Sequence, residues 1–264
     1  MLIIGERINA TRKRIGKAVA NRDAAFIGRE AKLQAEAGAT HIDCNAGRNP
    51  EREIADLQWM IGVVQDAVDL PLCIDSPSAP AIAAALKSVR KKPIINSVTA
   101  EKSKLEQVLP LVQEHGAHVV ALCLGDGGMP DGVADRIRAA EQIRDAAAKR
   151  GIAADRLYFD PVIVPASTNP SEAVAAIETV RHIMKEFGGA HTTCGLSNIS
   201  FGLPSRNTLN RTFLAMLLAA GLDAVIMDPT EPHMMSTALA GRAILGRDEW
   251  CMEYIKAGRA EKLD

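Results

Sequence analysis

The chain has 264 residues, of which 31 are basic and 32 acidic, and a formal net charge of −1. Its content of 47% apolar and 24% charged residues is typical of a folded globular protein and excludes a disordered or fibrous one. The absence of a basic excess and the 3% aromatic content argue against a nucleic-acid-binding surface, which needs cationic side chains and stacking rings.

Short apolar runs alternate along the chain with longer stretches of helical period. Ile54, Leu57, Ile61 and Val64 show the helical spacing between the second and third runs. Eight runs are candidate strands: residues 2–5, 40–44, 72–75, 94–96, 118–123, 157–160, 192–196 and 224–227. Eight β–α units predict an α/β fold of the (β/α)₈ TIM-barrel type. A doubly wound open sheet is the alternative, but no G-x-G-x-x-G opens a helix after any of these strands.

Helix boundaries are marked by prolines and glycines. Asn49, Ser76 and Asn169 each precede a proline, which predicts an N-cap followed by the first helical residue. Gly38 and Gly116 come just before candidate strands and are expected to end helices with a positive φ.

The end of the chain, from about residue 248, predicts an extra C-terminal helix that packs Trp250 and Tyr254 against the barrel. No linker or shift in composition separates two parts. We therefore expect residues 1–264 to form a single domain.

Neither a membrane span nor a secretory leader is expected. No uncharged apolar run approaches the about 20 residues that cross a bilayer, and the apolar run at the start is short and precedes its charges. The five cysteines are scattered, without zinc-site spacing, and four of them lie in apolar runs as expected of buried side chains. These features favour a cytoplasmic protein with no metal site of its own.

Polar side chains follow almost every candidate strand, at the barrel end where active sites lie. They are Glu6, Arg7, Asn9, Asp43, Asn45, Arg48, Asp75, Asn96, Asp160, Ser197, Asn198 and Asp228. A carboxylate accepts two parallel N–H bonds and a carboxamide donates and accepts, which suits a flat heterocycle such as a pterin or guanine. A single aspartate or serine at such a position is often only a helix cap, but their joint occurrence favours a ligand site.

Other motifs are weaker. Gly195 to Ile199 begins like a nucleophile elbow, yet the second glycine and the triad order are missing. The glycine-rich loop at 125–132 lacks the lysine and hydroxyl residue of a phosphate loop. The basic run Thr11 to Arg14 is either a solvated helix start or an attractor for an anionic substrate tail. No candidate strand ends in the lysine that a Schiff-base lyase or aldolase needs.

Several of these segments together resemble a known family. They are Ile4–Gly5–Glu6–Arg7–Ile8–Asn9, Ile42–Asp43–Cys44–Asn45, Cys73–Ile74–Asp75–Ser76, Ile95–Asn96–Ser97, Phe159–Asp160–Pro161, Gly195–Leu196–Ser197–Asn198–Ile199–Ser200–Phe201 and Asn210–Arg211–Thr212–Phe213. The chain resembles the methyltetrahydrofolate:corrinoid protein methyltransferases of the pterin-binding methyltransferase family. It is also similar to the folate module of cobalamin-dependent methionine synthase. The resemblance runs in register from residue 1 to about residue 260.

The resemblance implies a barrel that holds tetrahydrofolate or 5-methyltetrahydrofolate at its mouth. Asp75, Asn96 and Asp160 match the residues that hydrogen-bond the pterin ring in that family, and Asn198 matches the catalytic asparagine near N5. Glu6, Asn9, Ser197 and Arg206 match further positions of the same site. The implied reaction is an SN2 methyl transfer between N5 and a cobalt(I) corrinoid, in which Asn198 hydrogen-bonds N5. The loop at 125–132 and the residues after the eighth strand depart from the family pattern.

The resemblance also implies partners. The sequence has no Asp-x-His-x-x-Gly stretch of a cobalamin module, so the cobalamin is expected on a separate corrinoid protein. The family suggests a homodimer, while the direction of transfer stays open. Two alternative functions share the barrel. A dihydropteroate synthase-like enzyme would carry a glycine-rich acidic motif where Asn45 to Asn49 stand, and a non-catalytic folate-binding barrel is disfavoured by Asn198.

Overall fold

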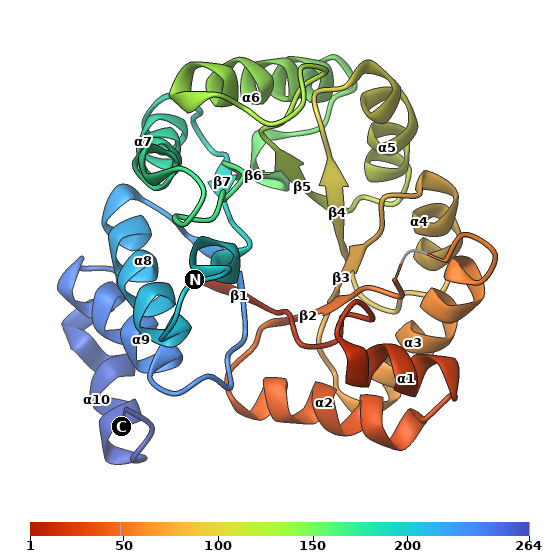
Figure 1. Ribbon diagram of the computed structural model, residues 1–264, viewed down its shortest axis with the longest axis horizontal. Helices are drawn as coiled ribbons and strands as arrows, with labels where there is room; N and C mark the ends of the chain where they lie inside the picture. Colours follow the sequence, from red (N-terminus) through yellow and green to blue (C-terminus); the bar gives the residue numbers. More distant parts are fainter. Residues whose placement is uncertain (48, 264) are drawn as a thin grey trace.

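The structure is a computed structural model that describes residues 1–47 and 49–263, so Arg48 lies outside the described residues. Its strands are β1 (Leu2–Gly5), β2 (His41–Cys44), β3 (Leu72–Asp75), β4 (Ile94–Val98), β5 (His118–Leu122), β6 (Leu157–Asp160), β7 (His191–Thr192) and β8 (Ala224–Met227). They form one parallel sheet of eight strands in the order β7-β6-β5-β4-β3-β2-β1-β8. Figure 1 shows this sheet as a ring of strands inside a ring of helices.

The ring closes between β7 and β8. A parallel bridge joins Gly195 to Ile226, and the Ile226 N–H donates to the Cys194 carbonyl at 2.9 Å. The predicted (β/α)₈ barrel is therefore confirmed, and the open-sheet alternative is wrong.

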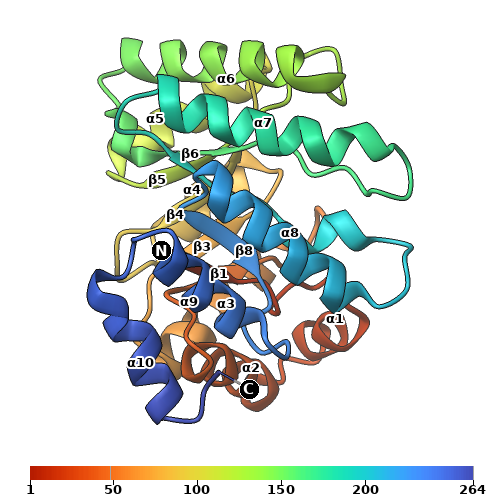
Figure 2. The same ribbon diagram turned by 90° about the vertical axis from the view of Figure 1, so that its left-hand side faces the viewer.

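Helices cover the outside of the barrel (Figures 1 and 2). The helices are α1 (Lys13–Ala20), α2 (Ala24–Glu36), α3 (Glu53–Ala67), α4 (Ala79–Leu86), α5 (Lys102–Glu114), α6 (Gly132–Lys149), α7 (Pro170–Glu186), α8 (Arg206–Ala220), α9 (Met234–Ile244) and α10 (Met252–Arg259). Short 3₁₀ helices are η1 (Ala154–Arg156), η2 (Leu196–Ser200) and η3 (Glu249–Cys251). None of the helices in the described ranges is long and apolar enough to cross a membrane.

The seventh strand is shorter than predicted, and its second half is not a strand. The β6 ladder continues only to the Thr193 N–H, which donates to the Phe159 carbonyl at 2.9 Å. The Gly195 N–H then donates to the Asp160 carboxylate instead of a backbone carbonyl. The chain turns into η2 at this point, so Ser197 lies on a 3₁₀ helix rather than at a strand end.

One of the three predicted N-caps is confirmed. Asn169 accepts the Ser171 N–H at 3.1 Å, with Pro170 at the first position of α7. The cap of α4 is Ser78 rather than Ser76, and α3 begins at Glu53, well after Asn49.

The C-terminal helix is present as α10, but the packing predicted for Trp250 is wrong, because its side chain is 83% exposed. The reason is local. The Asp248 carboxylate accepts the N–H groups of Glu253 and Tyr254, both at 3.0 Å, and so caps α10. Trp250 lies in the intervening turn with φ 53°, and its ring is directed to solvent.

Two hydrophobic layers fix the strand ends in place. Ile4, Cys73, Ile94, Val120 and Ile226 are buried together inside the barrel. Two larger clusters fill the space between the strands and the surrounding helices. Because neighbouring residues on a strand point to opposite faces, every second residue of each strand points into the barrel.

A buried arginine holds the loop that follows β6. Arg136 on α6 is fully buried and forms an ion pair of 2.6 Å with Glu172 on α7. Its guanidinium also donates to the Pro161 and Val162 carbonyls at 2.5 and 3.1 Å. These bonds satisfy the buried charge and fix the backbone directly after Asp160.

Replacing Arg136 by methionine is expected to lower the free energy of unfolding by about 3–5 kcal/mol, because the change leaves Glu172 buried without its partner. Chemical denaturation measures this loss. The matched control is Arg138→Ala on the same helix, whose ion pair with Asp135 is exposed and whose loss should cost less than about 1 kcal/mol. Equal effects of the two changes would contradict a structural role for the buried pair.

Candidate active site

The residues predicted as a site come together at the carboxyl ends of the strands, the catalytic face of this fold. Glu6 follows β1, Asp75 ends β3, Asn96 lies in β4 and Asp160 ends β6. Ser197 and Asn198 lie on η2, while Arg206 is the first residue of α8. Asn9 lies in the loop after β1 and forms a parallel bridge with Asn45.

Asp75 and Asn96 are directly opposite each other on neighbouring strands. The Asn45 amide donates to Asp75 Oδ2 at 2.8 Å and orients this carboxylate. The peptide bond after Asn96 is cis. A carboxylate beside a carboxamide offers both acceptors and a donor to one edge of a flat ring. The sequence places Asn45 after the second strand but does not indicate its role in the site, because nothing in the sequence reveals its bond to Asp75.

Asp160 is almost fully buried. Its Oδ1 accepts the Val162 N–H at 2.8 Å, and its Oδ2 accepts the Gly195 N–H at 3.3 Å. Burial raises the pKa of this carboxyl to about 6, against the opposing effects of the two N–H bonds and of Arg136. The carboxyl therefore changes charge just below neutral pH.

This shift predicts a pH dependence of ligand binding. N–H donors of a heterocycle prefer the ionised carboxylate, which is present above the raised pKa of Asp160, about 6, and lost as pH falls through it. We expect folate affinity, measured by calorimetry across this range, to fall on acidification. In Asp160→Asn the folate affinity should be weaker and should not change with pH across this range. If the affinity of the variant fell equally on acidification, the pH dependence would belong to another group.

Glu6 connects β1 to η2. The Ser197 hydroxyl donates to both Glu6 carboxylate oxygens at 2.8 and 3.1 Å, and Arg12 lies 3.3 Å from one of them. Burial raises the pKa of Glu6, while the Ser197 bond and Arg12 act in the opposite sense. The contact brings together residues that are 191 positions apart in the sequence.

The Asn198 side chain is exposed. A Cβ placed on Gly195 would lie only 3.0 Å from Asn198 Nδ2. Any larger residue at position 195 would therefore displace the Asn198 carboxamide. Within the described part of the chain its side chain makes none of the recorded hydrogen bonds. Both its donor and its acceptor are thus directed to a ligand or solvent.

Arg206 and Asn9 stabilise the backbone around this site. The Arg206 guanidinium donates to Ser200 Oγ at 3.0 Å and to the Ser197 carbonyl at 2.7 Å, which fixes η2. Asn9 Oδ1 accepts from the backbone and hydroxyl of Thr11 at 3.0 and 2.6 Å. Their observed contacts are therefore with the protein itself.

No group of three or more metal-ligating side chains is found within the described ranges. Cys44, Cys73, Cys123 and Cys194 are buried, as predicted, and burial raises the pKa of each thiol. None of these four cysteines has the accessible, acidic thiol of a nucleophile.

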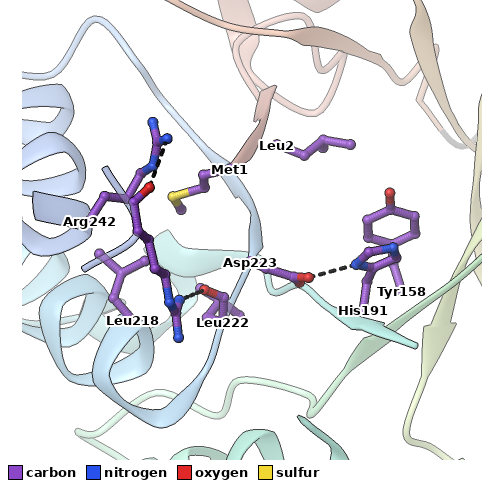
Figure 3. Close-up of a pocket in the computed structure, with 9 residues that line it drawn as sticks. Met1, Leu2, Tyr158, His191, Leu218, Leu222, Asp223 and Arg242 are labelled. Carbon is purple, nitrogen blue, oxygen red and sulfur yellow. Dashed lines mark hydrogen bonds and ion pairs between the residues drawn. The ribbon is translucent and has the colours of Figure 1, made fainter. Parts of the chain in front are cut away.

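A separate cavity of about 300 Å³ lies at the opposite end of the barrel (Figure 3). Tyr158 stacks on His191 there with ring centroids 4.7 Å apart, and His191 lies 2.6 Å from Asp223. These residues lie at or near the amino ends of strands, where this fold places residues for stability. The cavity is therefore distinct from the candidate active site.

The fold and the site define a barrel whose mouth carries carboxylates and carboxamides arranged for a flat, N–H-rich heterocycle. A family model described as "Pterin binding enzyme" matches residues 5–228. The chain belongs to this family, which confirms the resemblance drawn from its sequence motifs.

Individual relatives refine the comparison. The chain is 38% identical to a methylcorrinoid:tetrahydrofolate methyltransferase from Eubacterium limosum, over 100% of this chain and 98% of the relative. It is 32% identical to a methionine synthase from Mycobacterium leprae over 86% of this chain, but spans only 20% of that protein. The structure of a dihydropteroate synthase from Xanthomonas albilineans in complex with 7,8-dihydropteroate has a TM-score of 0.68, at 19% identity and 92% coverage of both chains. At this identity it supports the fold alone.

Proposed function

We propose that the protein is a methyltransferase that moves a methyl group between a methylated corrinoid and N5 of tetrahydrofolate. The observation that carries this proposal is the set Asp75, Asn96 and Asp160 at one barrel end, in a chain 38% identical throughout to a methylcorrinoid:tetrahydrofolate methyltransferase. A dihydropteroate synthase activity has only the likeness of folds in its favour. Residues 1–264 form the one domain that carries this activity.

The pterin edge of the folate is held from three strands. The carboxylates of Asp75 and Asp160 accept N–H groups of the ring, and the Asn96 amide complements them as donor and acceptor. Glu6, Ser197 and Arg206 form the opposite side of the site through their mutual contacts. Asn9 secures the loop after β1 next to Asn45.

The chemistry needs no covalent protein intermediate. N5 attacks the methyl carbon as the cobalt–carbon bond breaks, the bonding pair stays on cobalt, and the proton of N5 is released. In the reverse direction N5 leaves well only when protonated or strongly hydrogen-bonded. Asn198 supports both directions by hydrogen bonding: its carboxamide oxygen accepts a hydrogen bond from N5–H before the proton passes to solvent, and its NH2 group donates to N5 in the reverse direction.

The corrinoid is supplied by a separate corrinoid protein that presents it to the barrel mouth. We also propose a homodimer. Large apolar side chains remain exposed along α9 to α10, with Ile244 85%, Trp250 83% and Met252 58% exposed, as on a surface that a second copy covers. Sedimentation equilibrium tests the dimer, and a monomer across micromolar concentrations would overturn it. A cytoplasmic location stays a prediction.

The test of the activity uses free methylcobalamin in place of the corrinoid protein. Mixing it with tetrahydrofolate and the purified protein under reducing, oxygen-free conditions should convert the visible spectrum of methylcobalamin to that of cob(I)alamin. The reverse mixture, cob(I)alamin with methyltetrahydrofolate, should give the opposite change. Spectra that stay constant in both mixtures, with folate bound according to calorimetry, would contradict methyl transfer.

A further inference from the structure

Three neighbouring strands bring three carboxyl groups together at the mouth: Glu6 after β1, Asp43 in β2 and Asp75 at the end of β3. Asp43 pairs in register with Cys73, whose side chain is packed inside the barrel. Residues paired in this way point to the same face of a sheet. Asp43 therefore points into the barrel, below Asp75, and its side chain belongs to the floor of the candidate site.

Asp43 is buried, with 2% of its surface exposed, and its Oδ1 has no hydrogen-bond partner within the described part of the chain. The groups that face it are Asp75 and Cys73 on β3, Glu6 after β1 and Asn96 on β4. On its own strand the neighbouring group is the Cys44 thiol. The two charges that act on it, Asp75 and Glu6, are both negative.

An ionised Asp43 would be a costly arrangement. A carboxylate removed from water without a cation is unfavourable, and a second carboxylate beside it adds repulsion. Burial first and Asp75 second raise the pKa of Asp43 well above its usual range, while the side chains of Cys73 and Asn96 only partly oppose them. Two carboxyls that interact strongly release their protons in two separate steps, and between these steps the pair holds one proton.

We propose that Asp43 and Asp75 share one proton in the substrate-free protein, with Asp43 as the neutral partner that positions the Asp75 carboxylate for the N–H donors of the ligand. Asn45 holds Asp75 Oδ2 from one side at 2.8 Å, and the neutral Asp43 supports it from below. Asp43 is thus a positioning residue rather than a catalytic one. This proposal depends on the proposed function only for the identity of the ligand.

The protonation state is measured without folate or corrinoid, so its outcome is independent of the proposed function. Protein labelled with ¹³C at aspartate carboxyls is examined by infrared spectroscopy at mildly alkaline pH, above the pKa of about 6 of Asp160. We expect a C=O band of a protonated aspartic acid that disappears in Asp43→Asn. The control Asp69→Asn, whose side chain is 94% exposed, should keep the band. Absence of the band in the wild type, or its persistence in Asp43→Asn, would overturn the proposal.

A second variant covers the case in which Asp43→Asn does not fold. Asp75→Asn removes the negative charge beside Asp43, and the remaining aspartic acid band should then titrate at lower pH, by at least about one unit. An unchanged midpoint would show that the two groups do not share a proton and would overturn the proposal.

Ligand binding tests whether Asp43 positions Asp75 or only fills space. Asparagine resembles the neutral acid in shape and donates to Asp75, whereas leucine fills the space without a polar group. Folate affinity should therefore fall at least about tenfold less in Asp43→Asn than in Asp43→Leu. Equal losses would reject the positioning role. A wild-type protein that binds no folate would contradict the proposed function and leave the infrared result standing.

Discussion

Replacing Asn198 by alanine is expected to reduce the rate of methyl transfer by about 100- to 1,000-fold, with little change in folate affinity. The reason is that the carboxamide contributes when the charge on N5 changes, in the transition state, whereas the pterin edge is bound by other residues. The measurement is a single-turnover rate of cobalamin absorbance change, combined with calorimetry of methyltetrahydrofolate binding.

The matched control is Asn207→Ala, another exposed asparagine, at the start of α8. It should leave both rate and affinity unchanged. Equal losses of rate and affinity in Asn198→Ala would assign this residue to binding. An unchanged rate would remove it from the mechanism altogether.

Replacing Asp75 by asparagine is expected to weaken methyltetrahydrofolate binding by about 10- to 100-fold. The change removes a negative acceptor and directs N–H groups at the N–H donors of the ring. Asn45, which donates to Asp75 Oδ2 at 2.8 Å, also loses its charged partner. Calorimetry measures the dissociation constant.

Asp69→Asn is the control for this change, because it alters the net charge of the protein by the same amount at an exposed position that precedes β3. It should bind folate as the wild type does. Wild-type affinity in Asp75→Asn would reject the assignment of Asp75 to the pterin edge.

Much of this arrangement could be predicted from the sequence, because a parallel barrel places all strand ends at one mouth. The alternation of apolar runs indicated all eight strands, and Asp75 and Asp160 ended theirs as predicted. Gly38 and Gly116 have the positive φ of 105° and 61° expected before strands. Local patterns suffice for such features, since they depend on a few neighbouring residues.

The remaining features depend on contacts between distant segments. The short β7 follows from the bond between Gly195 and Asp160, which no local propensity indicates. The buried pair of Arg136 and Glu172 spans two helices, and both residues resemble ordinary surface residues in the sequence. The sequence places Asp43 at the mouth, but its burial beside Asp75 becomes visible only in three dimensions.

The proposed function is tested most directly by following the methyl group itself. Methylcobalamin labelled with ¹³C in its methyl group is incubated with tetrahydrofolate and the protein, and the products are analysed by NMR. We predict that the label appears on N5 of the folate, in step with the formation of cob(I)alamin, and that Asn198→Ala slows both together. Label that stays on cobalt while folate is bound, or that appears on another atom, would contradict the proposed methyl transfer.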